Sequence, residues 1–199
     1  MKSFVAVLTL VVSLSVVHSA SAQSFDISAH AAFSKWSEFE GVDKGFGGRL
    51  SFKALPLVGI EADLTWYPSD FTPEGPPFSR SRVEGLFGAT VGPDLGRIRP
   101  FAKATAGFLK VSPTNGAFAC IAIFPPPLSC ELAGGKTLPA FEIGGGIEID
   151  AASRAFIRAD ITDRILKYPG PTFDKDFNVQ NEGFLGHALR FTAGVGFRF

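Results

Sequence analysis

The feature that most constrains this 199-residue chain is a hydrophobic alternation with a period of two, which recurs after Gln23. Between Val58 and Trp66, for example, apolar side chains at even positions alternate with small or polar ones at odd positions. Successive side chains on a strand point to opposite faces, so each such stretch predicts a strand with one apolar and one polar face. Eight segments follow the pattern: 25–34, 46–54, 58–66, 82–91, 101–108, 141–149, 155–162 and 189–199.

The connections between these segments carry a second pattern, since long and short ones alternate. In an up-and-down barrel, odd and even connections lie at opposite ends, and bacterial transmembrane barrels have long external loops and short periplasmic turns. Most segments hold about nine to twelve residues, close to the roughly 9–11 that cross a bilayer at a tilt. We predict an all-β chain that forms a closed eight-stranded antiparallel transmembrane barrel with periplasmic termini. Its long connections are 35–44, 68–79, 112–137 and 166–183; the short ones are 55–57, 93–97 and 150–153.

Two kinds of barrel satisfy this alternation, and they differ in which face is turned outward. A soluble lipocalin-like barrel in the periplasm would enclose a ligand with its apolar face, whereas a membrane barrel turns that face to lipid. The polar face here mixes both signs of charge with glycines, which suits a narrow interior filled with ion pairs. We therefore favour the membrane barrel and predict interior ion pairs among Arg49, Lys53, Glu61, Asp63, Arg82, Glu84, Lys103, Glu142, Glu148, Arg158, Asp160 and Arg190.

The aromatic composition is lopsided, with 21 Phe against 2 Tyr and 2 Trp. Side chains that face lipid need apolar area without polar groups, so a lipid-facing belt accounts for the Phe excess. Trp and Tyr prefer the membrane interface, and we interpret Trp36, Trp66, Tyr67 and Tyr168 as an aromatic girdle at the external strand ends. The net charge of zero argues against nucleic acid as a partner.

The first 22 residues have the organisation of a secretory signal peptide. Lys2 precedes an apolar run over residues 4–17, and the small residues Ala20 and Ala22 then flank Ser21. These are the charged region, the apolar core and the small-x-small cleavage site of an export signal. We predict cleavage after Ala22, which leaves 23–199 as a single outer-membrane barrel domain.

Cys120 and Cys130 are the two cysteines, and both lie in the exported part of the chain. Two cysteines in an oxidising compartment favour one disulfide, here within the longest predicted external connection. A metal site is the weaker interpretation, because no His, Asp or further Cys accompanies the pair.

Several stretches resemble the small eight-stranded OmpA/OmpX-type family of bacterial outer-membrane proteins. The last eleven residues, 189–199, resemble the family's C-terminal strand, which has apolar residues at every second position and a terminal Phe. Residues 59–67, 99–103, 141–148 and 158–160 are similar to other strands of the family. The resemblance implies the same barrel fold and assigns to Phe197 and Phe199 an assembly signal that the barrel-assembly machinery reads.

The sequence gives little support for catalysis. Hydrolysis needs a nucleophile, a base and an orienting acid within reach of one another. Of the two histidines after the signal peptide, His30 falls on the polar face and His187 on the apolar face, and no Ser lies close to His187 in sequence. Eight strands enclose an interior that side chains just fill, although a small channel for ions or solutes remains an alternative.

We therefore expect an integral outer-membrane protein with a structural or surface-interaction role. It would be a non-enzymatic monomer without a cofactor, and it would contact lipid and lipopolysaccharide. Proline-rich segments such as 125–127 stiffen the long connections, which suits either recognition of an external ligand or resistance to proteases.

Overall fold

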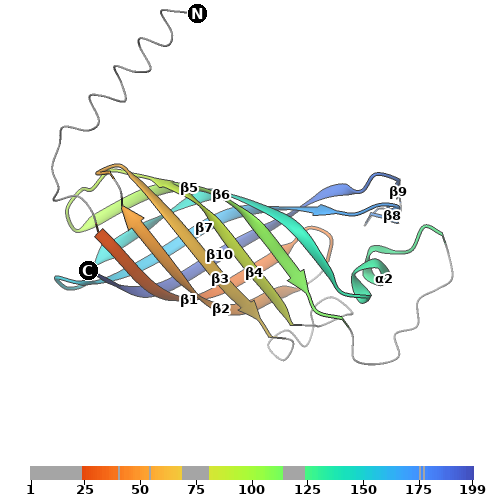
Figure 1. The fold of residues 1–199 in the computed structure, drawn as a ribbon, viewed down its shortest axis with the longest axis horizontal. Helices are drawn as coiled ribbons and strands as arrows, with labels where there is room; N and C mark the ends of the chain where they lie inside the picture. The colour runs from red at the N-terminus through yellow and green to blue at the C-terminus, as the bar shows by residue number, and fades with distance from the viewer. Residues whose placement is uncertain are drawn as a thin grey trace, which may run out of the picture.

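The computed structural model describes residues 24–39, 41–53, 55–68, 81–113, 124–174, 176 and 178–199. Within these ranges the chain forms a closed barrel with the strand order β1-β10-β7-β6-β5-β4-β3-β2, in which all neighbouring strands are antiparallel (Figure 1). The predicted all-β class and eight-stranded barrel are confirmed. The barrel strands are β1 (Ser24–Trp36), β2 (Val42–Lys53), β3 (Val58–Tyr67), β4 (Arg82–Val91), β5 (Ile98–Val111), β6 (Lys136–Asp150), β7 (Ala155–Tyr168) and β10 (Phe184–Arg198).

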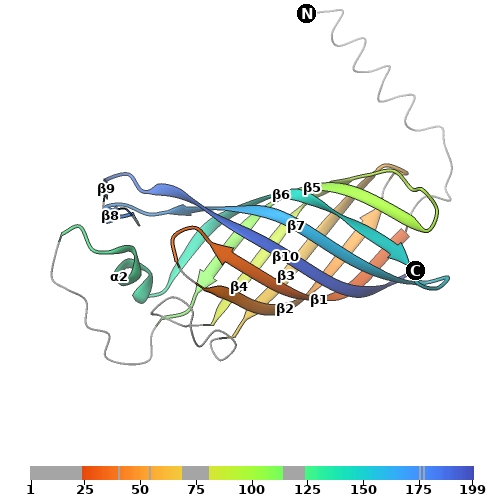
Figure 2. The same ribbon diagram turned by 180° about the vertical axis from the view of Figure 1, so that it is seen from behind.

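The two ends of the barrel differ. The short-turn end holds the start of β1, the C-terminus and the turns that join β2 to β3, β4 to β5 and β6 to β7, and the strand ends that the other four connections join lie at the opposite, long-loop end (Figures 1 and 2). Three short elements, which the sequence did not predict, lie at the long-loop end: the helix α2 (Leu128–Ala133) and the paired strands β8 (Thr172–Phe173) and β9 (Val179–Gln180). No helix in the described ranges is long and apolar enough to span a bilayer.

Several strands extend further toward the long-loop end than predicted. β7 continues to Tyr168, β1 continues to Trp36 and β2 begins at Val42, so the first connection covers only 37–41. Gly41 adopts a φ of 98° there, a left-handed conformation that favours glycine and permits a tight reversal. This connection is therefore shorter than the short-turn connection 92–97, and the predicted alternation of long and short connections is wrong at this point.

The barrel wall has an apolar outer face and a charged inner face. Along β3, exposed and buried residues alternate without interruption. Leu64 is 59% exposed on the outside, whereas Glu61 and Asp63, at 1% and 3%, point into the interior. A lipocalin-like barrel would have the opposite arrangement, so the structure contradicts the soluble ligand-binding alternative.

The aromatic girdle predicted at the long-loop end is wrong for three of its four residues. Trp66 faces outward and is 45% exposed, but Trp36, Tyr67 and Tyr168 are buried inside the barrel. Their positions follow the inward parity of their strands. Gly45 makes room for one of them, because a Cβ at that position would lie 2.6 Å from Cδ1 of Tyr67.

Candidate functional site in the barrel interior

The centre of the interior is organised around Arg190 of β10. Its Nη2 donates to Asp63 Oδ1 at 3.0 Å and its Nη1 donates to Glu142 Oε2 at 2.9 Å. Its Nε donates to the Tyr67 hydroxyl at 3.2 Å and lies 3.3 Å from Glu84 Oε1. Arg190 is fully buried, so one guanidinium holds together carboxylates from three other strands.

Lys103 of β5 organises a second group of carboxylates. Its Nζ lies 2.7 Å from Glu142, 3.2 Å from Glu61 and 3.5 Å from Asp160. Arg49 of β2 approaches the same group from another wall, because its Nη2 lies 2.8 Å from Asp160 Oδ2. Since Glu142 also accepts from Arg190, the two groups are continuous across the lumen.

Arg158 of β7 extends the network toward the short-turn end. It donates to Glu61 and Asp160 at 2.8 Å each and to Glu148 at 3.3 Å. Its guanidinium carbon lies 4.0 Å from the centre of the Phe101 ring, a cation–π geometry that adds to the ion pairs.

The interior charges balance within the described residues. Leaving His30 aside, six buried cations face eight buried carboxylates, and Lys53 and Arg198, which pair with Glu148 and Asp26, supply two further cations. Burying an ion is costly unless it is paired and hydrogen-bonded, so this balance is what allows a charged interior in so narrow a barrel. Every residue predicted to form interior ion pairs is located in this network or pairs at its edges, as Arg82 does with Asp43 and Lys53 with Glu148.

Two buried members of the network, Asp43 and Arg164, were not predicted from the sequence. Asp43 accepts from Arg82 Nη2 and from Trp36 Nε1, both at 2.8 Å. Arg164 pairs with Glu84 and donates to Ser34 Oγ at 2.7 Å. The expected strands began at residue 46 and ended at residue 162, so both residues fell just outside them. Continuing the alternation by one or two more inward positions would have found them.

At the long-loop end, the interior becomes apolar on the side formed by β5, β6 and β7. Leu109, Leu138 and Leu166, from three adjacent strands, are at most 1% exposed and pack in one cluster with Leu128 and Leu132 of α2. Trp36 and Tyr168 belong to the same cluster. We call this cluster the apolar closure. It lies beside the Asp43–Arg82 pair, which also reaches the long-loop end and accepts a hydrogen bond from Trp36 of the closure.

The predicted disulfide and signal peptide are only partly covered by the structure. Cys130 lies in α2, whereas Cys120 and residues 1–22 lie outside the described residues. The pairing of the two cysteines and the cleavage after Ala22 therefore stay predictions.

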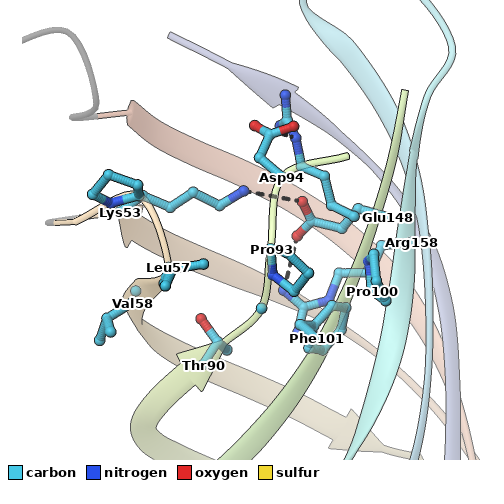
Figure 3. Close-up of a pocket in the computed structure, with 14 residues that line it drawn as sticks. Lys53, Leu57, Val58, Thr90, Pro93, Asp94, Pro100, Phe101, Glu148 and Arg158 are labelled. Carbon is cyan, nitrogen blue, oxygen red and sulfur yellow. Dashed lines mark hydrogen bonds and ion pairs between the residues drawn. The ribbon is translucent and has the colours of Figure 1, made fainter. Parts of the chain in front are cut away.

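The barrel interior opens at the short-turn end, and we call this opening the mouth. A cavity of about 260 Å³ lies between Lys53, Asp94, Arg99 and Arg198. Figure 3 shows the smaller adjoining pocket of about 30 Å³, where Lys53 reaches Glu148 and Glu148 in turn contacts Arg158. That volume admits only one or two water molecules, so the pocket ends against the ion-pair network.

Asp94 lies in the 92–97 connection at this mouth. Slight burial acts to raise the pKa of its carboxyl, but hydrogen bonds from the Gly96 amide and the Arg99 side chain outweigh burial and hold that pKa below its usual value. The Arg99 Nε lies 3.0 Å from Asp94 Oδ2. This pair fastens the turn to β5.

His30, Asp63 and Thr65 form a contact that superficially resembles a catalytic triad. The His30 Nε2 lies 2.9 Å from Thr65 Oγ1 and 3.7 Å from Asp63 Oδ2. Thr65 is fully buried, however, and its hydroxyl already donates to Asp63 and accepts from Arg190. A substrate has no room to approach this hydroxyl, so the arrangement serves packing.

His187 lies on the outer face, where its Nδ1 is 2.8 Å from Asp163 Oδ2. Within the described residues, no group of three or more His, Cys, Asp or Glu side chains is arranged to hold a metal ion.

Comparison with solved structures identifies the architecture. Neither a protein-family model nor a curated protein sequence matches the chain. The chain is similar to Neisserial surface protein A, with a TM-score of 0.56 and 16% identity over 92% of this chain and 100% of that one. It is also similar to the N-terminal β-barrel domain of Pseudomonas aeruginosa OprF, with a TM-score of 0.51 and 13% identity over 87% and 97% of the two chains. The chain has the fold of the small eight-stranded outer-membrane barrels.

Proposed function

We propose that this chain is an integral outer-membrane barrel with a structural or surface-interaction role and no catalytic activity. The observation that carries the proposal is the sidedness of the wall, with Leu64, Phe87 and Ile143 about 60% exposed outside and charged residues fully buried inside. Exposed apolar area on this scale is incompatible with a water-soluble monomer. A lipid environment accounts for it directly.

The orientation proposed for the barrel follows the asymmetry of its ends. Transmembrane barrels of bacteria have their longer loops outside and their turns in the periplasm. We therefore assign the long-loop end to the cell surface and both termini to the periplasm. A signal peptide over residues 1–22 and a Cys120–Cys130 disulfide in an external loop fit the same route of export.

Membrane fractionation followed by gel electrophoresis tests this proposal. We expect the protein in detergent-extracted outer membrane, with a band that shifts on heating because the folded barrel resists the detergent until it is heated. Protease added to intact cells should then cut within the long connections only. Recovery as a freely soluble periplasmic monomer would overturn the proposal.

The filled interior favours a structural role over the channel alternative. The central cross-section is occupied by the side chains of Arg190, Lys103 and Arg158 with their carboxylate partners, and the apolar closure lies beyond it. In a planar lipid bilayer, we expect the purified barrel to give no stable conductance steps. Reproducible single-channel steps would support the channel instead.

We further propose that Phe197 and Phe199 form the signal by which the assembly machinery recognises the last strand. Phe197 faces outward and is 59% exposed, and Phe199, beyond the end of β10, is 70% exposed. The Phe199 amide donates to the Phe25 carbonyl at 2.9 Å, so the residue also helps to close the barrel seam.

Deletion of Phe199 tests this role in cells. We expect the membrane yield to fall, while the outward-facing Phe191→Leu variant on the same strand keeps its yield. An unchanged yield after the deletion would contradict the assembly role. Refolding of the deletion variant in vitro separates assembly from intrinsic stability.

A further inference from the structure

The outer face of the barrel strands carries charge at one end only. Every charged side chain with outward parity lies within five residues of the long-loop end of its strand, whereas the outward positions at the short-turn end are apolar, as Phe25, Phe52 and Ile149 show. The outward charged and titratable side chains are Lys35, Lys44, Lys110, Asp163, Lys167 and His187. Four lysines thus face a single carboxylate.

Most of these residues gather on one side of the barrel. The strands β2, β1, β10 and β7 are consecutive neighbours in the wall and carry all of these residues except Lys110 (Figure 2). Asp163 is occupied by His187 at 2.8 Å. Among the ion pairs of the described residues, none involves Lys35 or Lys44.

Lys35 and Lys44 are diagonal neighbours on the outer face. In the β1–β2 register, Lys35 lies opposite Val42 and Lys44 lies opposite Phe33. Diagonal neighbours in an antiparallel pair are roughly 7–8 Å apart, and the long lysine side chains allow both ammonium groups to converge on one anionic group. Like charges placed so close repel each other, so an anion between them relieves a cost of the free barrel.

An aromatic surface continues from this lysine pair toward the middle of the membrane-facing wall. Phe33 is 40% exposed next to Lys44 and contacts Phe191 with ring centres 6.4 Å apart. Phe46, two residues after Lys44, is 47% exposed on the same face. The patch therefore combines two cations at the membrane edge with an apolar surface that acyl chains can cover.

From this geometry we propose that Lys35 and Lys44 bind a phosphate group of a phosphorylated, multiply acylated lipid in the outer leaflet, with its acyl chains against Phe33, Phe46 and Phe191. The lipid portion of lipopolysaccharide has this chemistry. The inference rests on the proposed outer-membrane location, and it names the site at which that lipid is held. Basic side chains at a membrane surface attract anionic lipid in this way.

Native mass spectrometry of the folded barrel in non-ionic detergent tests the site, with bisphosphorylated lipid A as the probe and dephosphorylated lipid A as its uncharged counterpart. We expect the wild type to prefer the phosphorylated form. The double variant Lys35→Gln/Lys44→Gln should bind it about 25-fold more weakly, because each Lys beside an anionic lipid contributes roughly fivefold in affinity.

Lys110→Gln is the matched control, since Lys110 is an outward-facing lysine near the same end but on β5. We expect it to bind the phosphorylated lipid as the wild type does. Equal affinity of the double variant and the control, or equal binding of both lipids by the wild type, would overturn the lipid site. Failure of the proposed outer-membrane function would give another result, because the wild-type protein would then stay soluble without detergent.

Discussion

The two halves of the barrel interior are filled by different kinds of side chain. From the short-turn end to the centre, inward positions are filled by ion pairs such as Arg190 with Asp63 and Glu142. Toward the long-loop end, inward positions of β5, β6 and β7 hold leucines such as Leu109 and Leu166, while the Asp43–Arg82 ion pair persists on β2 and β4. The outer face carries apolar side chains along both halves and charged ones only near the long-loop end. Contact with lipid thus requires an apolar outer face. The interior is required only to be filled by side chains and to pair its buried charged and polar groups.

The difference between the halves also concerns specificity. The planar guanidinium group pairs well with carboxylates in only a few geometries. The network also joins residues far apart in sequence, such as Arg190 and Asp63, whose numbers differ by 127. Such pairs form only when the barrel closes in the correct register. The apolar closure, which includes Leu128 and Leu132 of α2, is held by non-directional apolar contacts, so it contributes less to fixing the register.

Removal of Arg190 is the severest test of the charged half. We expect Arg190→Met to lower the free energy of unfolding by about 4 kcal/mol, because Asp63, Glu84 and Glu142 would then lose a buried partner. Urea unfolding in phosphocholine vesicles, followed by the heat-dependent gel shift, measures the loss. Arg99→Met is the control at the open mouth, where its partners Asp94 and Asp150 are 53% and 24% exposed, and it should cost much less. Equal losses in the free energy of unfolding would show that the central ion pairs stabilise the barrel no more than those at the mouth.

A cavity in the apolar closure should cost somewhat less. We expect Leu109→Ala to lower the free energy of unfolding by about 3 kcal/mol, since Leu109 is fully buried and its loss leaves an unfilled space. Leu109→Met keeps the volume and should cost less than about 1.5 kcal/mol. The same urea titration compares the two. If both variants matched the wild type, the closure would not be packed as described.

The exposed mouth should give the smallest effect. The Asp94 side chain is 53% exposed, and exposed pairs contribute roughly 0.2–1 kcal/mol. Because folding lowers the pKa of Asp94, its contribution is present above the pKa of the unfolded chain and is lost as pH falls through the folded value. The stability gap between wild type and Asp94→Asn should therefore shrink from pH 7 toward pH 3. A gap that does not change with pH would contradict the Asp94–Arg99 contact.

The sequence predicted the wall of the barrel well and its ends poorly. Strict alternation within a stretch such as 58–66 determines which side chains share a face, so strand number and the identity of the charged face followed from it. The alternation weakens near the long-loop end, where Trp36 and Tyr168 occupy the inner face beside polar neighbours. An aromatic residue there fits both an external girdle and an internal closure, and only the direction of the side chain decides between them.

The sequence also did not predict which charged residues pair with each other across the lumen. Alternation places Arg158 and Glu61 on the inner face but does not say which strands face each other, because that depends on the stagger between strands at closure. In the structure Arg158 Nη2 lies 2.8 Å from Glu61 Oε2, although the two residue numbers differ by 97. The alternation in the sequence therefore predicted which charged residues face the interior. Only the closed barrel shows which of them pair with one another.

The chain contains two tryptophans that report on the two sides of the wall. Trp66 is 45% exposed on the outer face, whereas Trp36 is 6% exposed in the apolar closure. The variants Trp36→Phe and Trp66→Phe each leave one of them, and vesicles with brominated acyl chains quench the fluorescence of a tryptophan that contacts lipid. We predict strong quenching of Trp66 and little quenching of Trp36. Equal quenching of both, or quenching of Trp36 alone, would contradict the assignment of the apolar face to lipid.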